Sequence, residues 1–195
     1  ADWLRRYVAS DTPVHVQPVF SNVGEPDEVL PYEQRDSYAV VFGGRSMKQR
    51  LYKAIEPSHA KEIRNKGICQ ILDIGSPSGT REIHGIPIRE YGIQPAKKID
   101  VMLREAKAGL LSYNTDFITK SGVWAAYAAH GVPALISDTG QVAETIVSLP
   151  FTCLSGNLPC LKDLSCCIAD WYEHKAHSRL AARHILQYLT STKKI

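Results

Sequence analysis

The sequence has little that would suit the protein to a membrane or to a nucleic acid. None of its apolar runs approaches the ~20 residues that span a bilayer, and no apolar leader stands at its start. Its 23 lysines and arginines only slightly outnumber its 20 acidic residues, and the basic residues are scattered along the chain. A long surface that follows a phosphate backbone is therefore not expected, although the composition leaves room for a local anion site.

Two further absences narrow the chemistry. The five cysteines are odd in number and irregular in spacing, and no Cys-x-x-Cys pair occurs, which favours reduced thiols in the cytosol over disulfides or a zinc site. The dinucleotide-binding pattern Gly-x-Gly-x-x-Gly is also missing, so a nicotinamide-dependent enzyme is disfavoured. We therefore expect a cytoplasmic protein without a metal ion; any association with a membrane would come from a missing half of the protein.

The first 37 residues differ in composition from the rest. They are rich in proline and acidic residues, and a loop of that length is unusual inside a compact domain. We predict that residues 1–37 are a linker from a missing N-terminal domain, with a short helix at Trp3–Val8 and a strand at Val14–Phe20. The rest, residues 38–190, suits one domain with a core between a sheet and two layers of helices.

Beyond this linker, short apolar runs alternate with helical patterns. The runs are β-branched, bounded by glycine or proline and free of polar alternation, as strands buried on both faces are. This alternation predicts a doubly wound, Rossmann-like α/β fold with a parallel sheet of about six strands in the order 3-2-1-4-5-6. The predicted strands are Tyr38–Phe42, Cys69–Ile74, Ile86–Tyr91, Gly109–Ser112, Pro133–Ser137 and Phe151–Leu154. The predicted helices are Met47–Ile55, His59–Asn65, Ala96–Ala106, Gly122–His130, Val142–Ser148 and the closing stretch Leu161–Leu189, which is long enough for two helices.

The loop after the first predicted strand has the composition of an anion site. In this strand order, ligands bind outside the carboxyl ends of the first and fourth strands. The first of these loops is Gly43-Gly44-Arg45, with Lys48 one helical turn later. Glycines allow a sharp turn and a close approach to a ligand, an arginine can hold two phosphate oxygens, and a lysine adds a point charge. Because cations at a helix N-terminus oppose its dipole, this charge calls for a compensating anion. The alternative is a plain turn before a solvated basic helix.

The loop after the fourth predicted strand supplies a second anion site. It contains Thr119, Lys120, Ser121 and Gly122, just before an alanine-rich helix. Ser121 is a suitable N-cap, and Gly122 leaves the free N–H groups of the first turn uncovered. These amides, the helix dipole and the lysine charge together favour an anion, so we interpret the two loops as a cradle for a diphosphate. The alternative is an N-cap beside an incidental lysine.

Other polar residues carry less weight. Ser137–Gln141, after the fifth strand, suits either a border of the ligand site or a turn with a helix cap. His174 and His177 lie one helical turn apart, but no carboxylate or cysteine completes a metal site, so a solvated helix face is expected. His130, before Gly131, suits the C-terminal cap of a helix.

One series of residues is distinctive in its order and spacing: Val40–Arg45 with Lys48, Leu110–Tyr113, Ala125–His130, Gly131–Pro133, Ser137 with Gly140, and Glu144. This series resembles the C-terminal, donor-binding domain of retaining, sugar-nucleotide-dependent glycosyltransferases with the GT-B fold. The stretch Trp171–Leu189 is similar to the closing helices of that family, and Val14–Asn22 resembles the strand that links its two domains. The resemblance covers residues 14–190.

The resemblance implies a function and two partners. In that family the two loops hold the diphosphate of a nucleotide-sugar without a metal ion, and an N-terminal domain holds the acceptor. The implied activity is that of a hexosyltransferase-like glycosyltransferase with a UDP- or GDP-linked donor, and the acceptor is left open between a glycan, a lipid-linked sugar and a protein. Helix amides and basic side chains would stabilise the leaving diphosphate. The implied binding residues are Gly43, Gly44, Arg45, Lys48, Thr119, Lys120, Ser121 and Gly122.

One departure from the family pattern leaves two hypotheses for the function of the domain. The family's paired glutamates would fall at Ile118 and Ala126, and neither residue is acidic. Asp116, two positions before the first, is the nearest carboxylate, and no catalytic residue is assigned. Two hypotheses therefore remain: a divergent donor-binding domain that holds its nucleotide-sugar in its own way, or a catalytically inactive domain that serves as a partner subunit or scaffold.

Overall fold

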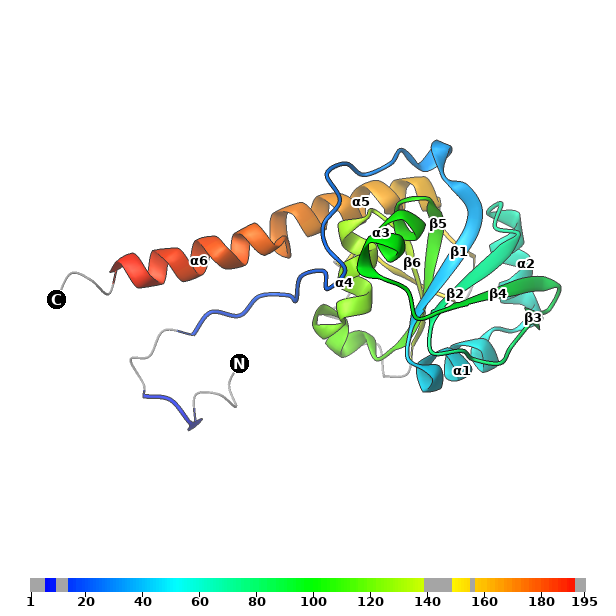
Figure 1. The fold of residues 1–195 in the computed structure, drawn as a ribbon, viewed down its shortest axis with the longest axis horizontal. Helices are drawn as coiled ribbons and strands as arrows, with labels where there is room; N and C mark the ends of the chain where they lie inside the picture. Colours follow the sequence, from blue (N-terminus) through cyan, green and yellow to red (C-terminus); the bar gives the residue numbers. More distant parts are fainter. Residues whose placement is uncertain (1–5, 10–13, 139–148, 155–156, 192–195) are drawn as a thin grey trace.

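The computed structural model describes residues 6–9, 14–138, 149–154 and 157–191. A twisted sheet of seven strands forms its centre, and helices cover both faces (Figure 1). The strands are β1 (Asp36–Gly43), β2 (Gln70–Gly75), β3 (Glu82–Ile83), β4 (Ile86–Gly92), β5 (Ala106–Tyr113), β6 (Ala134–Asp138) and β7 (Thr152–Cys153). The helices are α1 (Arg45–Ala54), α2 (Pro57–Asn65), α3 (Ala96–Arg104), α4 (Gly122–Ala129), α5 (Leu161–Lys175) and α6 (Ser178–Ser191), with short 3-10 helices η2 (Tyr32–Gln34) and η3 (Thr115–Lys120).

Six of the strands run parallel in the order that the sequence predicts. Neighbours in the sheet follow the order β3-β4-β2-β1-β5-β6-β7, which is 3-2-1-4-5-6 once the antiparallel edge strand β3 is left out. Strands β1 and β5, the first and fourth of the prediction, pair directly, with Val40 opposite Gly109. The doubly wound, Rossmann-like fold is thus confirmed. The carboxyl ends of these two strands open at the same edge of the sheet, where such folds bind ligands.

The edge strand β3 is absent from the prediction. It pairs with β4 across the two-residue turn His84–Gly85, whose φ angles are 46° and 84°. A two-residue hairpin needs positive φ at both positions, because only then does its twist match that of the strands. Two residues are too few to show strand alternation, and the turn carries histidine where asparagine or aspartate would signal it.

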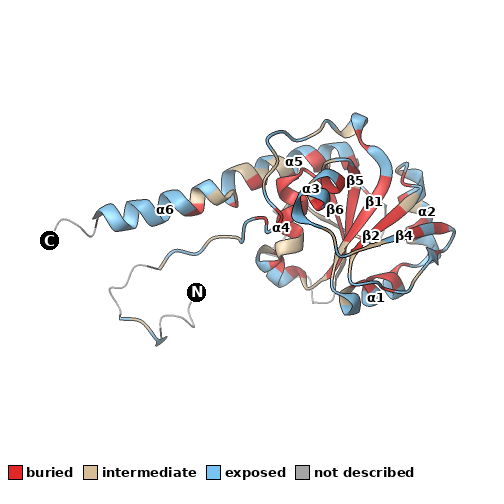
Figure 2. Ribbon diagram, viewed as in Figure 1, coloured by how far each residue is buried: buried red, intermediate tan, exposed pale blue. Residues whose placement is uncertain are grey.

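The sheet separates two apolar layers (Figure 2). Helices α3, α4 and α5 pack on one face, and α1 and α2 pack on the other. Helix α4 is buried on all sides, and its Tyr127 lies directly over Gly109 of β5, where an added Cβ would come within 2.5 Å of the ring. The Tyr127 hydroxyl donates to the carbonyl oxygens of Val40 and Leu110 at 3.2 and 3.1 Å. The glycine therefore lets an aromatic residue of α4 seat against the two central strands.

The helices agree with the sequence pattern apart from their ends. Helix α1 begins at Arg45, two residues earlier than predicted, and α3 ends at Arg104. The closing stretch is two helices, separated at Ala176 and His177. The predicted helix at Val142–Ser148 lies outside the described residues.

The predicted strand at Val14–Phe20 is not formed. This stretch is irregular, and the backbone hydrogen bond that ties it to the domain runs from the Val19 N–H to the Thr119 carbonyl, 3.0 Å. Strand propensity alone is not enough here, because a strand needs a neighbouring edge and this stretch pairs with no strand of the described sheet. The division of the chain at residue 37 stays a prediction.

Helix α6 and residues 14–20 extend from the same side of the domain (Figure 1). Most of α6 is exposed (Figure 2), including the apolar side chains of Ile185 and Leu186, each 61% exposed. A cavity of about 620 Å³ lies between the two segments and is lined by Val14, His15, Gln17, Ala181, His184, Ile185, Tyr188 and Leu189. The end of the chain thus presents an apolar surface beyond the body of the domain. Within the described ranges, no helix combines the length and apolar character that crossing a bilayer requires.

Candidate functional site

The β1–α1 loop follows the carboxyl end of β1, where a crevice between the two central strands is expected. Gly43 has a φ of 139°, and Gly44 is the N-cap of α1 without a side-chain hydrogen bond to the helix. Gly44, Arg45 and Ser46 are exposed, and no acidic residue lies in the first turn of α1. Arg45 therefore carries an exposed positive charge beside amides that the helix itself leaves unpaired.

Lys48 lies elsewhere than the sequence suggests. Its side chain is 0% exposed, and its ammonium group pairs with the carboxylate of Asp73 on β2 and donates to the Ser76 carbonyl at 2.9 Å. The Tyr52 hydroxyl donates to the other oxygen of Asp73 at 2.8 Å. Burial and the neighbouring charge of Asp73 raise the pKa of Tyr52, so it stays a donor. The sequence predicts that an anionic ligand compensates the charge of Lys48, but in the structure the carboxylate of Asp73 does so.

The β5–α4 loop follows the carboxyl end of β5, the other central strand. The Asn114 side chain accepts from the Asp116 N–H at 2.9 Å and begins η3. At the end of η3, Ser121 is the N-cap of α4, and its hydroxyl accepts from the Trp124 N–H at 3.2 Å, as predicted from the sequence. Lys120 is exposed, with its ammonium 4.8 Å from the centre of the Phe117 ring. The Gly122 and Val123 N–H groups have no partner within the described part of the chain and are free to bind an anion.

The two loops approach each other. Because β1 and β5 are neighbours, Gly43 lies next to the first turn of α4, and an added Cβ on Gly43 would be 3.8 Å from the Val123 side chain. The exposed cations Arg45 and Lys120 therefore belong to two neighbouring loops at one edge of the sheet, where α1 and α4 begin. Of the residues predicted to bind, Gly43, Gly44, Arg45, Thr119, Lys120, Ser121 and Gly122 gather at this edge, and Lys48 lies buried beneath it.

Two nearby polar residues were missed by sequence reasoning. The side chain of Asn22, an exposed residue of the N-terminal segment, lies over the start of α4, where an added Cβ on Gly122 would be 3.5 Å from its nitrogen. Ser112 on β5 is 2% exposed, and its hydroxyl has no hydrogen-bond partner within the described residues. Ser112 pairs with Ser137 of β6 near the carboxyl end of the strand. Only the folded chain brings Asn22 to this place, because 100 residues separate it from Gly122.

The positions of the family's paired glutamates are part of the core. Ile118 is 1% exposed and Ala126 is 0% exposed, and both belong to the apolar layer around α4. A carboxylate at either place would be buried among apolar groups, which costs free energy unless it is paired. Asp116 is exposed on η3. Of the loop after β6, residues 139–148 are outside the described residues.

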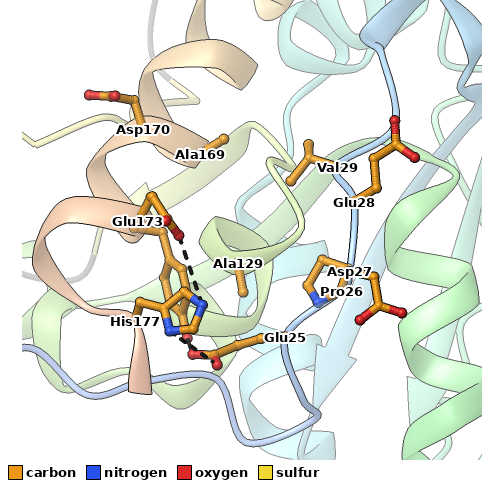
Figure 3. A pocket seen from close by; sticks show the side chains of 11 residues that line it. Glu25, Pro26, Asp27, Glu28, Val29, Ala129, Ala169, Asp170, Glu173 and His177 are labelled. Carbon is orange, nitrogen blue, oxygen red and sulfur yellow. Dashed lines mark hydrogen bonds and ion pairs between the residues drawn. The ribbon is translucent and has the colours of Figure 1, made fainter. Parts of the chain in front are cut away.

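The opposite end of α4 has a different character. A cavity of about 340 Å³ lies there beside Ala129, and five of its eleven lining residues are acidic (Figure 3). His177 faces Glu25 at 3.3 Å and Glu173 at 3.8 Å, while His174 pairs with Asp170 on the exposed face of α5. Among the described residues, no group of three or more His, Cys, Asp or Glu side chains is arranged to hold a metal ion. The negative charges around this cavity would repel a diphosphate, whereas the start of α4 has exposed basic side chains beside it.

Comparisons with known proteins support the fold. No family model and no curated protein sequence matches the chain. Solved structures do match it: AviGT4, a glycosyltransferase involved in avilamycin A biosynthesis, superposes with a TM-score of 0.56 at 16% sequence identity. A GtfA/B complex superposes with a TM-score of 0.50 at 13% identity. The fold is that of a glycosyltransferase Rossmann-like domain.

The two likenesses span almost all of this chain and only part of each neighbour. Each covers 92% of the chain, against 57% of AviGT4 and 39% of the GtfA/B chain. At these identities the likeness concerns the arrangement of strands and helices. The activity, substrates and partners of a whole protein are therefore matters for proposal.

Proposed function

We propose that this domain binds the diphosphate of a nucleotide-sugar for a glycosyltransferase, with a UDP- or GDP-linked donor. The observation that supports the proposal is that Gly43 lies beside the first turn of α4, so that two elements suited to an anion are neighbours. Arg45 would hold phosphate oxygens from the α1 side. Lys120 and the Gly122 and Val123 amides would hold them from the α4 side.

The chemistry of this arrangement suits a departing diphosphate. Negative charge develops on the leaving phosphate as the sugar–oxygen bond breaks, and fixed donors stabilise that charge without having to reorganise. Amides at a helix start and two basic side chains would do here what a metal ion does in other enzymes. The site is on this account a metal-free one, in a domain that works in the cytoplasm.

The acceptor would be held mainly by a separate N-terminal domain of the enzyme. The fraction of AviGT4 that the chain covers, 57%, leaves room for such a domain. The exposed apolar surface of α6 and residues 14–20 is where we expect it to pack. A glycan, a lipid-linked sugar and a protein all stay open as acceptors.

Calorimetric titration tests the proposal directly. UDP or GDP should bind the folded domain weakly but measurably, and Arg45→Ala should lower the affinity by about tenfold, because a charge-assisted hydrogen bond contributes roughly 1.5–3 kcal/mol. Arg50→Ala, which removes an exposed charge from the same helix, is the matched control and should leave the affinity unchanged. No binding of either nucleotide by the folded domain would overturn the proposal.

A specific observation favours a second candidate function. The buried, apolar Ile118 and Ala126 leave the domain without the carboxylates that the family's active members carry at these positions. A catalytically inactive domain of the same fold would instead act as a partner subunit or scaffold. In that case Arg45→Ala and Lys120→Ala would leave its function in the cell unchanged, whereas loss of that function in both variants would exclude the scaffold.

A further inference from the structure

We propose that Lys48 and Asp73 form a buried strut that positions the β1–α1 loop for the diphosphate, which makes Lys48 a positioning residue and not a phosphate ligand. The inference deepens the proposed function and rests on it. Its geometry is the ion pair between α1 and β2, where both side chains are 0% exposed. Neither residue can reach the crevice without breaking this pair.

The strut joins three segments below the crevice. The Lys48 ammonium contacts Asp73 and also donates to the Ser76 carbonyl, in the turn that follows β2, at 2.9 Å. Tyr52, one turn further along α1, donates to the second oxygen of Asp73 at 2.8 Å. One carboxylate thus binds two successive turns of α1, and one ammonium binds both β2 and its loop.

Two glycines meet directly above the ammonium. Gly43 and Gly75 are opposite each other at the ends of β1 and β2. An added Cβ on Gly75 would lie 2.7 Å from the Gly43 carbonyl and 3.6 Å from the Lys48 ammonium. The backbone of the loop that carries Arg45 therefore rests against β2, and the strut holds α1 in the same place.

Stability alone does not account for such a pair. A buried ion pair loses the hydration of both charges, and well-packed apolar residues in its place are often neutral or stabilising. What a hydrogen-bonded pair adds is that it holds α1 and β2 in a single relative position. Lys48 also lies in the first turns of α1, where an unpaired cation would oppose the helix dipole. The Asp73 carboxylate neutralises this cation, so the positive charge offered at the start of α1 comes from its unpaired amides and from Arg45.

The variant Asp73→Asn distinguishes two roles for Lys48, a positioning residue and a phosphate ligand that Asp73 holds back. If Lys48 were a phosphate ligand that Asp73 competes for, releasing it would raise the affinity for UDP. The strut predicts the opposite: UDP should bind about tenfold more weakly, within the usual range of coupling between sites. A rise in affinity, or no change in a variant that urea unfolding shows to be folded, overturns the proposal. Lys53→Met, an exposed lysine of the same helix, is the control and should bind as the unaltered protein does.

The double variant Lys48→Met/Asp73→Leu removes both charges and leaves the net charge unchanged. Urea unfolding should show a folded protein of lower stability, because the Tyr52 hydroxyl and the Ser76 carbonyl lose their partners. It should bind UDP about tenfold more weakly and retain the ionic-strength dependence of binding, since no ligand charge is lost. Arg45→Ala should instead weaken that dependence. Equal affinity in the double variant and the unaltered protein would overturn the strut.

Hydrogen exchange without any nucleotide distinguishes this inference from the proposed function. In the double variant the amides of residues 48–52, the first that α1 holds in backbone hydrogen bonds, should exchange at least about tenfold faster, while those of β5 keep their protection. Unchanged protection at residues 48–52 overturns the strut even if UDP binds. Faster exchange there, in a protein that binds neither UDP nor GDP, supports the strut and overturns the proposed function.

Discussion

The two ends of α4 differ in how their unpaired backbone groups are satisfied. At the C-terminal end the N–H groups of residues 130–132 donate to carbonyls of the last turn, and the Arg35 guanidinium donates to the carbonyls of His130 and Gly131 just beyond it. At the N-terminal end Ser121 caps the amide of Trp124, and the two preceding N–H groups, of Gly122 and Val123, have no partner among the described residues. The protein closes the end whose groups are carbonyls and leaves open the end whose groups are amides, so the helix offers its positive pole to the crevice.

Arg35 connects the closed end of α4 to two other segments. It is 4% exposed, and burial lowers the pKa of its guanidinium to about 10, which leaves it charged at neutral pH. Its partners are all backbone oxygens, from the N-terminal segment, β5 and the turn after α4. It therefore ties the segment that precedes β1 to the body of the domain.

Arg35→Ala should have the largest effect. Several buried carbonyls would lose their donor, so the free energy of unfolding should fall by about 3 kcal/mol, since each unsatisfied group costs roughly 1–3 kcal/mol. Urea unfolding measures this. Arg6→Ala, in the N-terminal segment but exposed, is the control. A loss under about 1 kcal/mol would mean that water takes over these contacts, and the contrast between the two ends would fail.

Lys120→Ala should act at the open end only. UDP affinity should fall by about tenfold, which corresponds to about 1.4 kcal/mol, while the stability stays unchanged because the side chain is exposed. Calorimetry and urea unfolding on the same sample separate the two effects. Lys97→Ala, an exposed lysine on α3, should change neither. If Lys120→Ala lowers stability and leaves UDP binding intact, the open end has a structural role instead.

Ser121→Ala should have a smaller effect on stability than Arg35→Ala. Loss of an N-cap side chain costs about 1 kcal/mol, whereas Ser121→Gly should cost only a few tenths. The pair is measured by urea unfolding. Equal losses in the two variants would show that the hydroxyl does more than cap the Trp124 amide.

The smallest effect concerns the contact between the N-terminal segment and α6. The Glu25 carboxylate accepts from the Tyr172 hydroxyl and from the Ser178 N–H, both at 2.7 Å. Burial raises its pKa, but hydrogen bonds from Ser178 and Tyr172 and the charge of His177 outweigh it, so the pKa lies below the usual 4.5. A lowered pKa stabilises the folded state above pH 4.5, and this contribution is lost as the pH falls through the folded value.

The start of α6 should therefore loosen on acidification. Exchange of the Ser178 amide, measured as the pH is lowered below 4.5, should accelerate beyond the intrinsic change for a free amide. Glu25→Gln should show faster exchange already at neutral pH and no such transition. Identical profiles for the two proteins would contradict the assignment.

Much of the fold could be predicted because strand–helix alternation is a local pattern with a global consequence. Six buried runs separated by helical patterns leave few arrangements once crossovers must be right-handed, and the observed order of the parallel strands follows. The candidate site was predictable in its loops, since the switch point of such a sheet lies beside its first strand. Gly43, Arg45, Lys120 and Gly122 needed no more than this rule.

The rest depended on contacts between distant residues. In the sequence Asp73 is a single polar residue within an apolar strand, and no local pattern predicts that it pairs with Lys48. Val14–Phe20 has the composition of a strand, yet the sheet offers it no edge. Asn22 lies in what looks like a linker, and its position over α4 follows from the path of the whole segment.

The sequence by itself determined the class of fold, the order of the parallel strands and the loops at which a ligand can meet amides and cations, because these follow from periodicity and chain connectivity. Only the tertiary structure decided which of those cations is left facing the solvent. A lysine pairs with a carboxylate that the fold brings within reach. When the lysine is buried this pairing is required, because an unpaired charge in the core costs too much free energy. Lys48 met Asp73 in this way, while Arg45 and Lys120 stayed at the surface.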